Sequence, residues 1–133
     1  MVVQPAVKAD TSSAVDRRFS REHRVRRRAE FQQVFEQGTR LHGRFLTLLV
    51  RPNGRAAARL GIVASRKIGD AVERNRAKRL VREMFRHFPG RRLGVDAVVI
   101  PRRELLDASF PDLTHDFRTV WRRAADRVVA HAR

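Results

Sequence analysis

The chain has 133 residues, enough for one ordinary domain, and its 30 lysines and arginines outnumber 14 aspartates and glutamates to give a net charge of +16. A hydrophobic share of 42% supports a packed core. The absence of cysteine excludes a disulfide framework, a thiolate zinc site and a cysteine nucleophile. We find no apolar run of roughly 18 residues that would predict a membrane span, and no secretory signal. We therefore expect a soluble, cytoplasmic protein that binds a polyanion.

The positive charge is concentrated in two stretches. Residues 17–28 carry seven arginines and one glutamate, and residues 66–92 carry ten basic and three acidic residues. Such clustering is typical of a nucleic-acid binder, because phosphates spaced along a strand are met best by a continuous positive surface. An arginine-rich composition inherited from a GC-rich genome would explain part of the excess but not its clustering.

The first segments of the chain show no regular pattern. Residues 1–16 lack periodicity and large aromatic side chains, which predicts a disordered N-terminal tail. Residues 17–28 form a basic arm that we expect to become ordered only against RNA or the domain surface. The single RNA-binding domain is predicted to span residues 17–133, with no internal repeat or linker.

A first helix is predicted over residues 28–37. Phe31, Val34 and Phe35 fall at i, i+3 and i+4, on one face of such a helix. Gly38 follows the last periodic residue, so we expect it to end the helix in the left-handed conformation.

Hydrophobic patterns and turn residues define the remaining elements. They predict strands over 45–50, 58–65 and 95–100, and helices over 71–88 and from about residue 109. The short connection between the first two strands makes them antiparallel, and the helical crossover makes the third strand parallel to the second. The expected fold class is therefore α+β, with the order α-β-β-α-β-α and a small mixed sheet packed with helices.

Catalysis by the protein itself has little support. A two-metal nuclease needs several converging carboxylates, yet Asp96 is the one acid within a predicted strand. Asp70, Glu73 and Glu83 are interleaved with arginines, which favours ion pairing. The five histidines are scattered without ligand spacing, and no phosphate-binding glycine loop is present.

The predicted helix over 71–88 carries the most specific pattern. Its apolar residues form one stripe, and its cations project from the opposite side as an almost unbroken ridge. Arginine suits bidentate contact with phosphate and stacking on bases, and a helix N-terminus adds N–H donors and a positive dipole end. The alternative is the solvated face of an ordinary amphipathic helix, which would mix acidic and basic residues more evenly.

The sequences S-R-K-I-G (65–69) and R-N-R-x-K-R-x-x-R-E (74–83) closely resemble the signature of the bacterial ribonuclease P protein component. The resemblance extends to the first predicted helix and to the strands around 60–63 and 96–100. It covers about residues 25–127. The basic motif is highly specific, and the other segments support it.

The resemblance implies the protein subunit of an RNA enzyme. In that family the fold contains a left-handed β-α-β crossover and is similar to a domain of a small-subunit ribosomal protein. The catalytic RNA subunit uses Mg²⁺, bound mainly by the RNA, for endonucleolytic removal of the 5′ leader from precursor tRNA. The protein binds this RNA and the leader and is expected to be inactive alone. No membrane and no obligate protein partner are predicted.

The resemblance also assigns residues to two sites. The positions that match the family's RNA-subunit-binding residues are Arg66, Lys67, Arg74, Asn75, Arg76, Lys78, Arg79 and Arg82. The family's leader-binding cleft lies between the first helix and the sheet. Phe31 and Phe35 match its aromatic wall, and we expect Leu46 and Leu48 to form its apolar floor. Leu48 stands where relatives have a tyrosine, and this chain has no tyrosine. No firm metal site is predicted, although Asn75 is a speculative ligand.

Other interpretations stay open at this stage. The two phenylalanines could pack into the core against the first strand, an alternative that applies more to Phe35 than to Phe31. The chain could also be a ribosomal or other structural RNA-binding protein without a substrate cleft. A DNA-compacting protein and a stand-alone nuclease are less well supported, because the first lacks a dimerisation stripe and the second lacks acidic residues.

Overall fold

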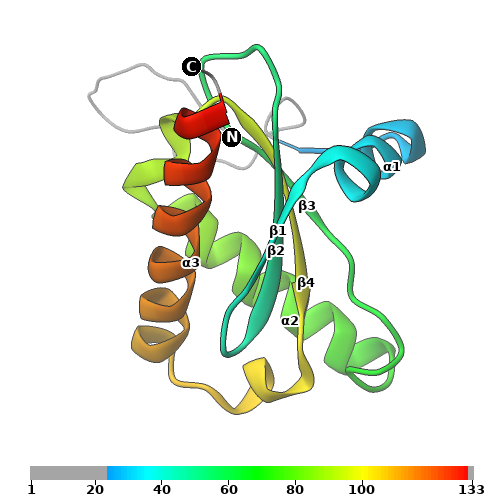
Figure 1. The fold of residues 1–133 in the computed structure, drawn as a ribbon. Helices are drawn as coiled ribbons and strands as arrows, with labels where there is room; N and C mark the ends of the chain where they lie inside the picture. Colours follow the sequence, from blue (N-terminus) through cyan, green and yellow to red (C-terminus); the bar gives the residue numbers. More distant parts are fainter. Residues whose placement is uncertain (1–23, 132–133) are drawn as a thin grey trace.

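The computed structural model describes residues 24–131, which form helices on both sides of a small sheet (Figure 1). The α+β class is confirmed, and one strand is added to the predicted order. The predicted tail and most of the basic arm, residues 1–23, lie outside the described residues. The elements in chain order are α1 (Arg28–Gln37), β1 (Thr39–His42), β2 (Leu46–Pro52), β3 (Arg59–Ile62), α2 (Ala71–Arg86), the 3-10 helix η2 (Pro89–Arg92), β4 (Val95–Pro101), the 3-10 helix η3 (Arg103–Asp107) and α3 (Phe110–His131).

The described strands form one mixed sheet in the order β1-β2-β4-β3. β1 and β2 pair as an antiparallel hairpin, and β2 pairs antiparallel with β4. β3 pairs parallel with β4, which confirms the parallel pairing predicted from the helical crossover between these two strands. β3 therefore runs opposite to β2, but β4 lies between them. The left-handed sense of the β3–α2–β4 crossover stays a prediction.

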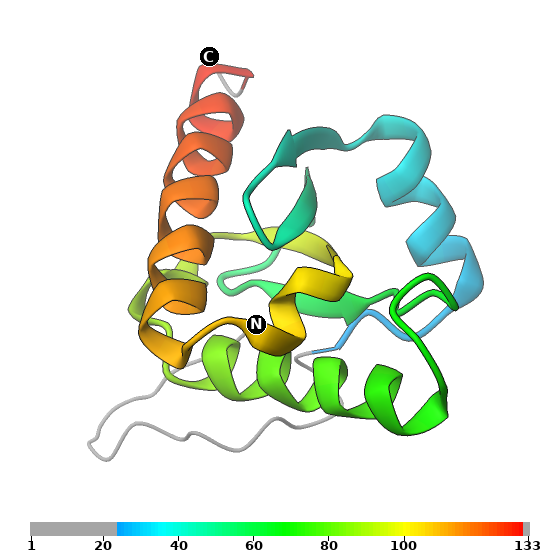
Figure 2. The same cartoon turned by 90° about the horizontal axis from the view of Figure 1, so that it is seen from below.

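One face of the sheet carries the main hydrophobic core. α2 and α3 lie on this side, whereas α1 lies on the other (Figures 1 and 2). Phe117 of α3 is completely buried, and its ring meets the rings of Phe85, Phe88 and Trp121 at centroid distances of 6.5, 5.0 and 5.6 Å. Large aromatic side chains therefore join the two long helices to each other over the sheet.

The opposite face carries a much smaller apolar cluster. Val34 of α1 packs on Leu49 of β2 and Val98 of β4, which are direct cross-strand partners. Phe31 and Ile100 are only partly buried against this group. Only alternate side chains of each strand point to this face. Because α1 is short, it covers only part of them.

Two local features differ from the prediction. Gly38 has a φ of −79° and is extended. A β-carbon there would lie 2.4 Å from the carbonyl oxygen of Val34 and 3.0 Å from that of Val50, so close approach of backbone explains the glycine. The strand β1 was not predicted, because only Leu41 of its four residues is buried and such a segment has little periodicity.

No helix in the described part of the chain is long and apolar enough to cross a lipid bilayer.

Candidate nucleic-acid interface

The helix α2 is held in a fixed orientation by its cap and its apolar stripe. Asp70 accepts a hydrogen bond from the backbone N–H of Glu73 at 2.8 Å, and the Glu73 carboxylate accepts one from the N–H of Asp70 at 3.1 Å. Four residues on one side, Ala77, Val81, Met84 and Phe85, are buried in the main core. The polar side of the helix consequently faces away from the sheet.

All eight residues predicted to bind the RNA subunit lie on α2 outside its buried stripe or in the loop before it. Glu83 instead pairs with Arg86 and His87, and Glu73 pairs with Arg103. Among residues 24–131, no ion pair joins the eight predicted residues to a carboxylate. Five of them are exposed, namely Arg66, Lys67, Asn75, Arg76 and Arg79, and three are half-buried, namely Arg74, Lys78 and Arg82.

Two of these arginines also have a structural role. Arg74 donates to the carbonyl oxygen of Gly69 at 3.0 Å and so closes the loop that leads into α2. Arg76 donates to the carbonyl oxygen of Leu106 at 2.9 Å and joins α2 to η3. The remaining N–H groups of each guanidinium are available for a phosphate, because arginine has five donors.

The aromatic residues of α1 differ from each other in burial. Phe31 is half-buried on β3, where a β-carbon on Gly61 would lie 2.7 Å from its ring. Phe35, one turn further along, exposes 38% of its surface. Packing against the sheet therefore applies to Phe31 more than to Phe35, which is the reverse of our prediction.

The predicted floor of the cleft is wrong. Leu46 and Leu48 are 0% exposed and belong to the main core with α3, on the opposite face of the sheet from α1. Leu49 faces α1 instead, and the buried Thr47 shares its strand parity. A shift of one residue in the assumed parity exchanges the two faces of a strand. The missing tyrosine at Leu48 thus concerns the core of this chain.

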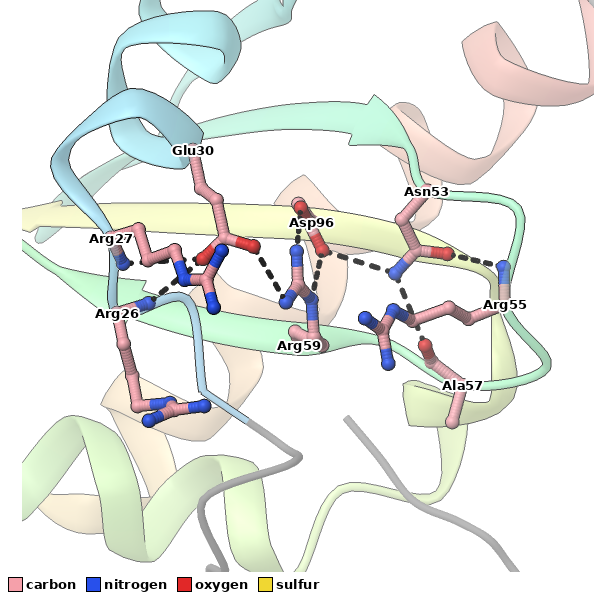
Figure 3. A network of polar contacts seen from close by, with 8 residues as sticks. All are labelled: Arg26, Arg27, Glu30, Asn53, Arg55, Ala57, Arg59 and Asp96. Carbon is pink, nitrogen blue, oxygen red and sulfur yellow. Dashed lines mark hydrogen bonds and ion pairs between the residues drawn. The ribbon is translucent and has the colours of Figure 1, made fainter.

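A polar network under α1 was not predicted from the sequence (Figure 3). Arg59 of β3 stands opposite Asp96 of β4 and donates to its two carboxylate oxygens at 2.8 and 2.6 Å. A third nitrogen of Arg59 lies 2.9 Å from the carboxylate of Glu30, and Asn53 donates to Asp96 at 3.1 Å. The hydrogen bonds to Asp96 outweigh burial and raise the pKa of Arg59.

Glu30 connects this network to the start of α1. Its carboxylate accepts hydrogen bonds from the backbone N–H groups of Arg26 at 3.3 Å and Arg27 at 3.2 Å. Partial burial alone would raise the pKa of Glu30, but these bonds and Arg59 together lower it below its ordinary value. The network therefore fixes the first turn of α1, in which Glu30 directly precedes Phe31.

The described residues do not fit a magnesium site held by the protein alone. No group of three or more histidine, aspartate or glutamate side chains is placed to hold a metal ion within residues 24–131. Asn75 is exposed on α2, between Arg74 and Arg76 and one turn before Lys78 and Arg79. Mg²⁺ prefers carboxylate, phosphate and water oxygens, so we assign no chemical step to a metal ion on this helix.

The ridge and the aromatic wall meet at the edge strand β3. A pocket of about 120 Å³ lies there, lined by Phe31 from the α1 side and by Lys78 and Arg82 from α2. The structure thus brings together members of both predicted sites. The leader-binding cleft was predicted between the first helix and the sheet, and this pocket lies where Phe31 of α1 packs against the edge strand β3.

Comparisons with known proteins place the chain in one family. The family model of ribonuclease P matches residues 19–125. The ribonuclease P protein component of Thermotoga maritima is 46% identical over 88 residues, which are 65% of this chain and 75% of the relative. That of Pseudomonas aeruginosa is 40% identical over 111 residues, which are 82% of each chain.

Solved structures give the same result for the fold. The ribonuclease P protein of Staphylococcus aureus superimposes with a TM-score of 0.69 at 30% identity, over 78% of this chain and 96% of that one. The protein from Thermotoga maritima has a TM-score of 0.67 at 37% identity, over 75% and 96% of the two chains. The chain therefore belongs to the ribonuclease P protein family.

Proposed function

We propose that this chain is the protein subunit of ribonuclease P and that it binds the RNA subunit through the outer side of α2. The observation that carries this proposal is the cationic ridge, whose members form no ion pair with a carboxylate among the described residues, whereas the acids of α2 pair elsewhere. Unneutralised arginines in a row suit the phosphates of folded RNA, and family membership supports this partner.

The second part of the proposal is that the α1 side of the sheet binds the 5′ leader of precursor tRNA. Phe35 is exposed, and Phe31 is half-buried beside the cations of α2. Bases of any sequence can stack on an aromatic ring, which suits a leader whose sequence varies between tRNAs. A positive groove next to aromatic side chains is typical of single-strand binding.

The chemistry belongs to the RNA subunit in this proposal. The RNA binds most of the Mg²⁺ that hydrolysis requires, and the protein holds the RNA and the leader in place. The complex acts in the cytoplasm, where its RNA partners are found. The family match argues against a ribosomal or DNA-compacting protein.

Reconstitution tests the proposal directly. The chain alone should not cleave precursor tRNA. Mixed with a bacterial ribonuclease P RNA, it should raise cleavage at low Mg²⁺, because its cations replace part of the screening that Mg²⁺ supplies. Cleavage by the protein without RNA, or no effect on the RNA at any Mg²⁺ concentration, would contradict it.

A further inference from the structure

Two exposed cations of the predicted RNA-binding set lie at the tip of a tight turn before α2. Arg66 and Lys67 occupy the two central positions of this turn. The N–H of Ile68 closes it by donating to the carbonyl oxygen of Ser65 at 3.1 Å. The hydroxyl of Ser65 also accepts a hydrogen bond from the N–H of Lys67 at 3.3 Å. The direction of both cationic side chains therefore depends on the backbone of residues 65–69.

The last residues of the turn are fixed by the core and by a glycine. Ile68 is 1% exposed and belongs to the main hydrophobic core. Gly69 has a φ of 148°, a conformation that other residues rarely adopt. A β-carbon at Gly69 would collide with the carboxylate of Glu73 and lie 3.0 Å from a guanidinium nitrogen of Arg103. These two charged side chains therefore lie directly against the backbone of the turn.

Two arginines from different elements bind the carbonyl oxygens at this end of the turn. The carbonyls of Ile68 and Gly69 precede α2, so they have no place in its backbone ladder. Arg74 of α2 donates to the carbonyl oxygen of Gly69 at 3.0 Å. Arg103 of η3 donates to the carbonyl oxygen of Ile68. Each arginine therefore supplies a donor that the helix does not provide.

Arg103 reaches the turn from an element that is itself fixed in place. Leu105 and Leu106 of η3 are buried in the main core, and Arg76 of α2 donates to the carbonyl oxygen of Leu106 at 2.9 Å. The guanidinium of Arg103 also lies 3.4 Å from the carboxylate of Glu73, which completes the cap of α2 with its other oxygen. This exposed ion pair adds little stability by itself, but it directs the guanidinium toward the turn.

We propose that Arg103 is a positioning residue for binding of the RNA subunit, because it holds the turn of residues 65–69 in the conformation that presents Arg66 and Lys67 to RNA. This inference rests on the proposed function and adds to it a residue outside α2 and its preceding loop. A flexible turn would have to be ordered when RNA binds, at a cost in free energy for each backbone residue. A turn that is already fixed avoids this cost.

Arg103→Met tests the proposal, because methionine keeps an apolar stem and removes the donor to Ile68. The Arg103 side chain is 58% exposed, so the variant should fold. Its affinity for a bacterial ribonuclease P RNA should be about tenfold lower than that of the wild-type chain, which corresponds to the ordering of one backbone residue. Arg103→Lys keeps a donor near the carbonyl of Ile68 and should recover most of the affinity.

A double-mutant cycle separates positioning from direct contact. In the Arg66→Gln, Lys67→Gln background the turn carries no cation, so adding Arg103→Met should change the affinity by less than about twofold. An equal loss in both backgrounds would show that Arg103 contacts RNA itself or destabilises the fold, and would overturn the proposal. Arg118→Met removes an exposed arginine from α3 and is the control for net charge. A loss as large as that of Arg103→Met would also overturn the proposal.

The turn gives a second readout that needs no RNA. Amide hydrogen exchange at Ile68 reports the bond that closes the turn onto Ser65. Exchange at Ile68 should be faster in Arg103→Met than in Arg118→Met, while exchange in β4 stays the same in both variants. Unchanged exchange at Ile68 would mean that Arg103 does not fix the turn.

The outcomes separate this inference from the proposed function. If the Arg66→Gln, Lys67→Gln variant binds the RNA subunit as tightly as the wild-type chain, the turn makes no contact with RNA. The positioning role is then overturned, and the function of the cations on α2 stands. Failure of the wild-type chain to bind the RNA subunit would overturn both.

Discussion

The two faces of the sheet are built from the same strands but are covered in different ways. On the α2 and α3 side, Leu46, Leu48 and Phe117 are 0% exposed within a continuous core. On the α1 side, the buried cluster among the described residues is Val34, Leu49 and Val98, and the ion pair of Glu30 with Arg59 joins the helix to the sheet. The first face supplies stability, and the second leaves aromatic and cationic groups accessible.

The difference teaches how a small domain can offer a binding surface without losing its fold. A helix held by an apolar stripe, such as α2, has a polar side that is free to carry many cations. A helix held by a small apolar cluster and a polar network, such as α1, can keep Phe35 exposed.

The largest expected effect is on the core face. Phe117→Ala should lower the free energy of unfolding by about 3–5 kcal/mol, because it removes a fully buried ring that contacts three other aromatic side chains. Phe35→Ala, the matched change on the α1 face, should cost less than about 1 kcal/mol. Urea denaturation of both variants measures the difference, and similar losses would abolish the distinction between the faces.

The sequence predicted the core face far better than the α1 face. The stripe from Ala77 to Phe85 follows helical periodicity, and β4 is apolar apart from Asp96, so both were predicted from local patterns. The network of Glu30, Arg59 and Asp96 joins residues far apart in the chain, and no local pattern indicates such pairs. The floor of the cleft was wrong because every residue of β2 from Leu46 to Val50 is buried, which hides the alternation that defines its two faces.

A smaller loss is expected when the network under α1 is broken. Arg59→Met should cost roughly 2 kcal/mol, because it leaves Asp96 buried without its bidentate partner. The same variant should also weaken binding of precursor tRNA, since α1 loses its contact through Glu30. Denaturation and binding are measured together, and an unchanged substrate affinity would limit the network to a stabilising role.

The pH dependence of Glu30 sharpens the same comparison. Because its pKa is lower in the folded than in the unfolded chain, its charge stabilises the fold above the ordinary glutamate pKa of about 4.3, and this contribution is lost as the pH falls through the folded value. Glu30→Gln should therefore cost about 1 kcal/mol at pH 7 and nothing at low pH. A difference between the two proteins that stays constant with pH would contradict the assignment.

The smallest effect on stability is expected on the ridge. Arg79→Gln should change the free energy of unfolding by less than about 0.5 kcal/mol, because Arg79 is exposed. It should reduce the slope of log affinity against log salt for the RNA subunit by roughly 0.7–0.9, the value of one phosphate contact. Arg118→Gln removes an exposed arginine from α3 and serves as the control, and an equal change in slope for both would assign the effect to net charge.

The affinity of Phe35→Ala for precursor tRNA and for mature tRNA, measured with the reconstituted complex, addresses the central claim that the open face of the sheet holds the leader. We predict a loss of about 1–3 kcal/mol with the precursor, the value of one stacked base, and no loss with the mature tRNA. Equal losses with both RNAs would contradict the claim, because mature tRNA has no leader for this face to bind.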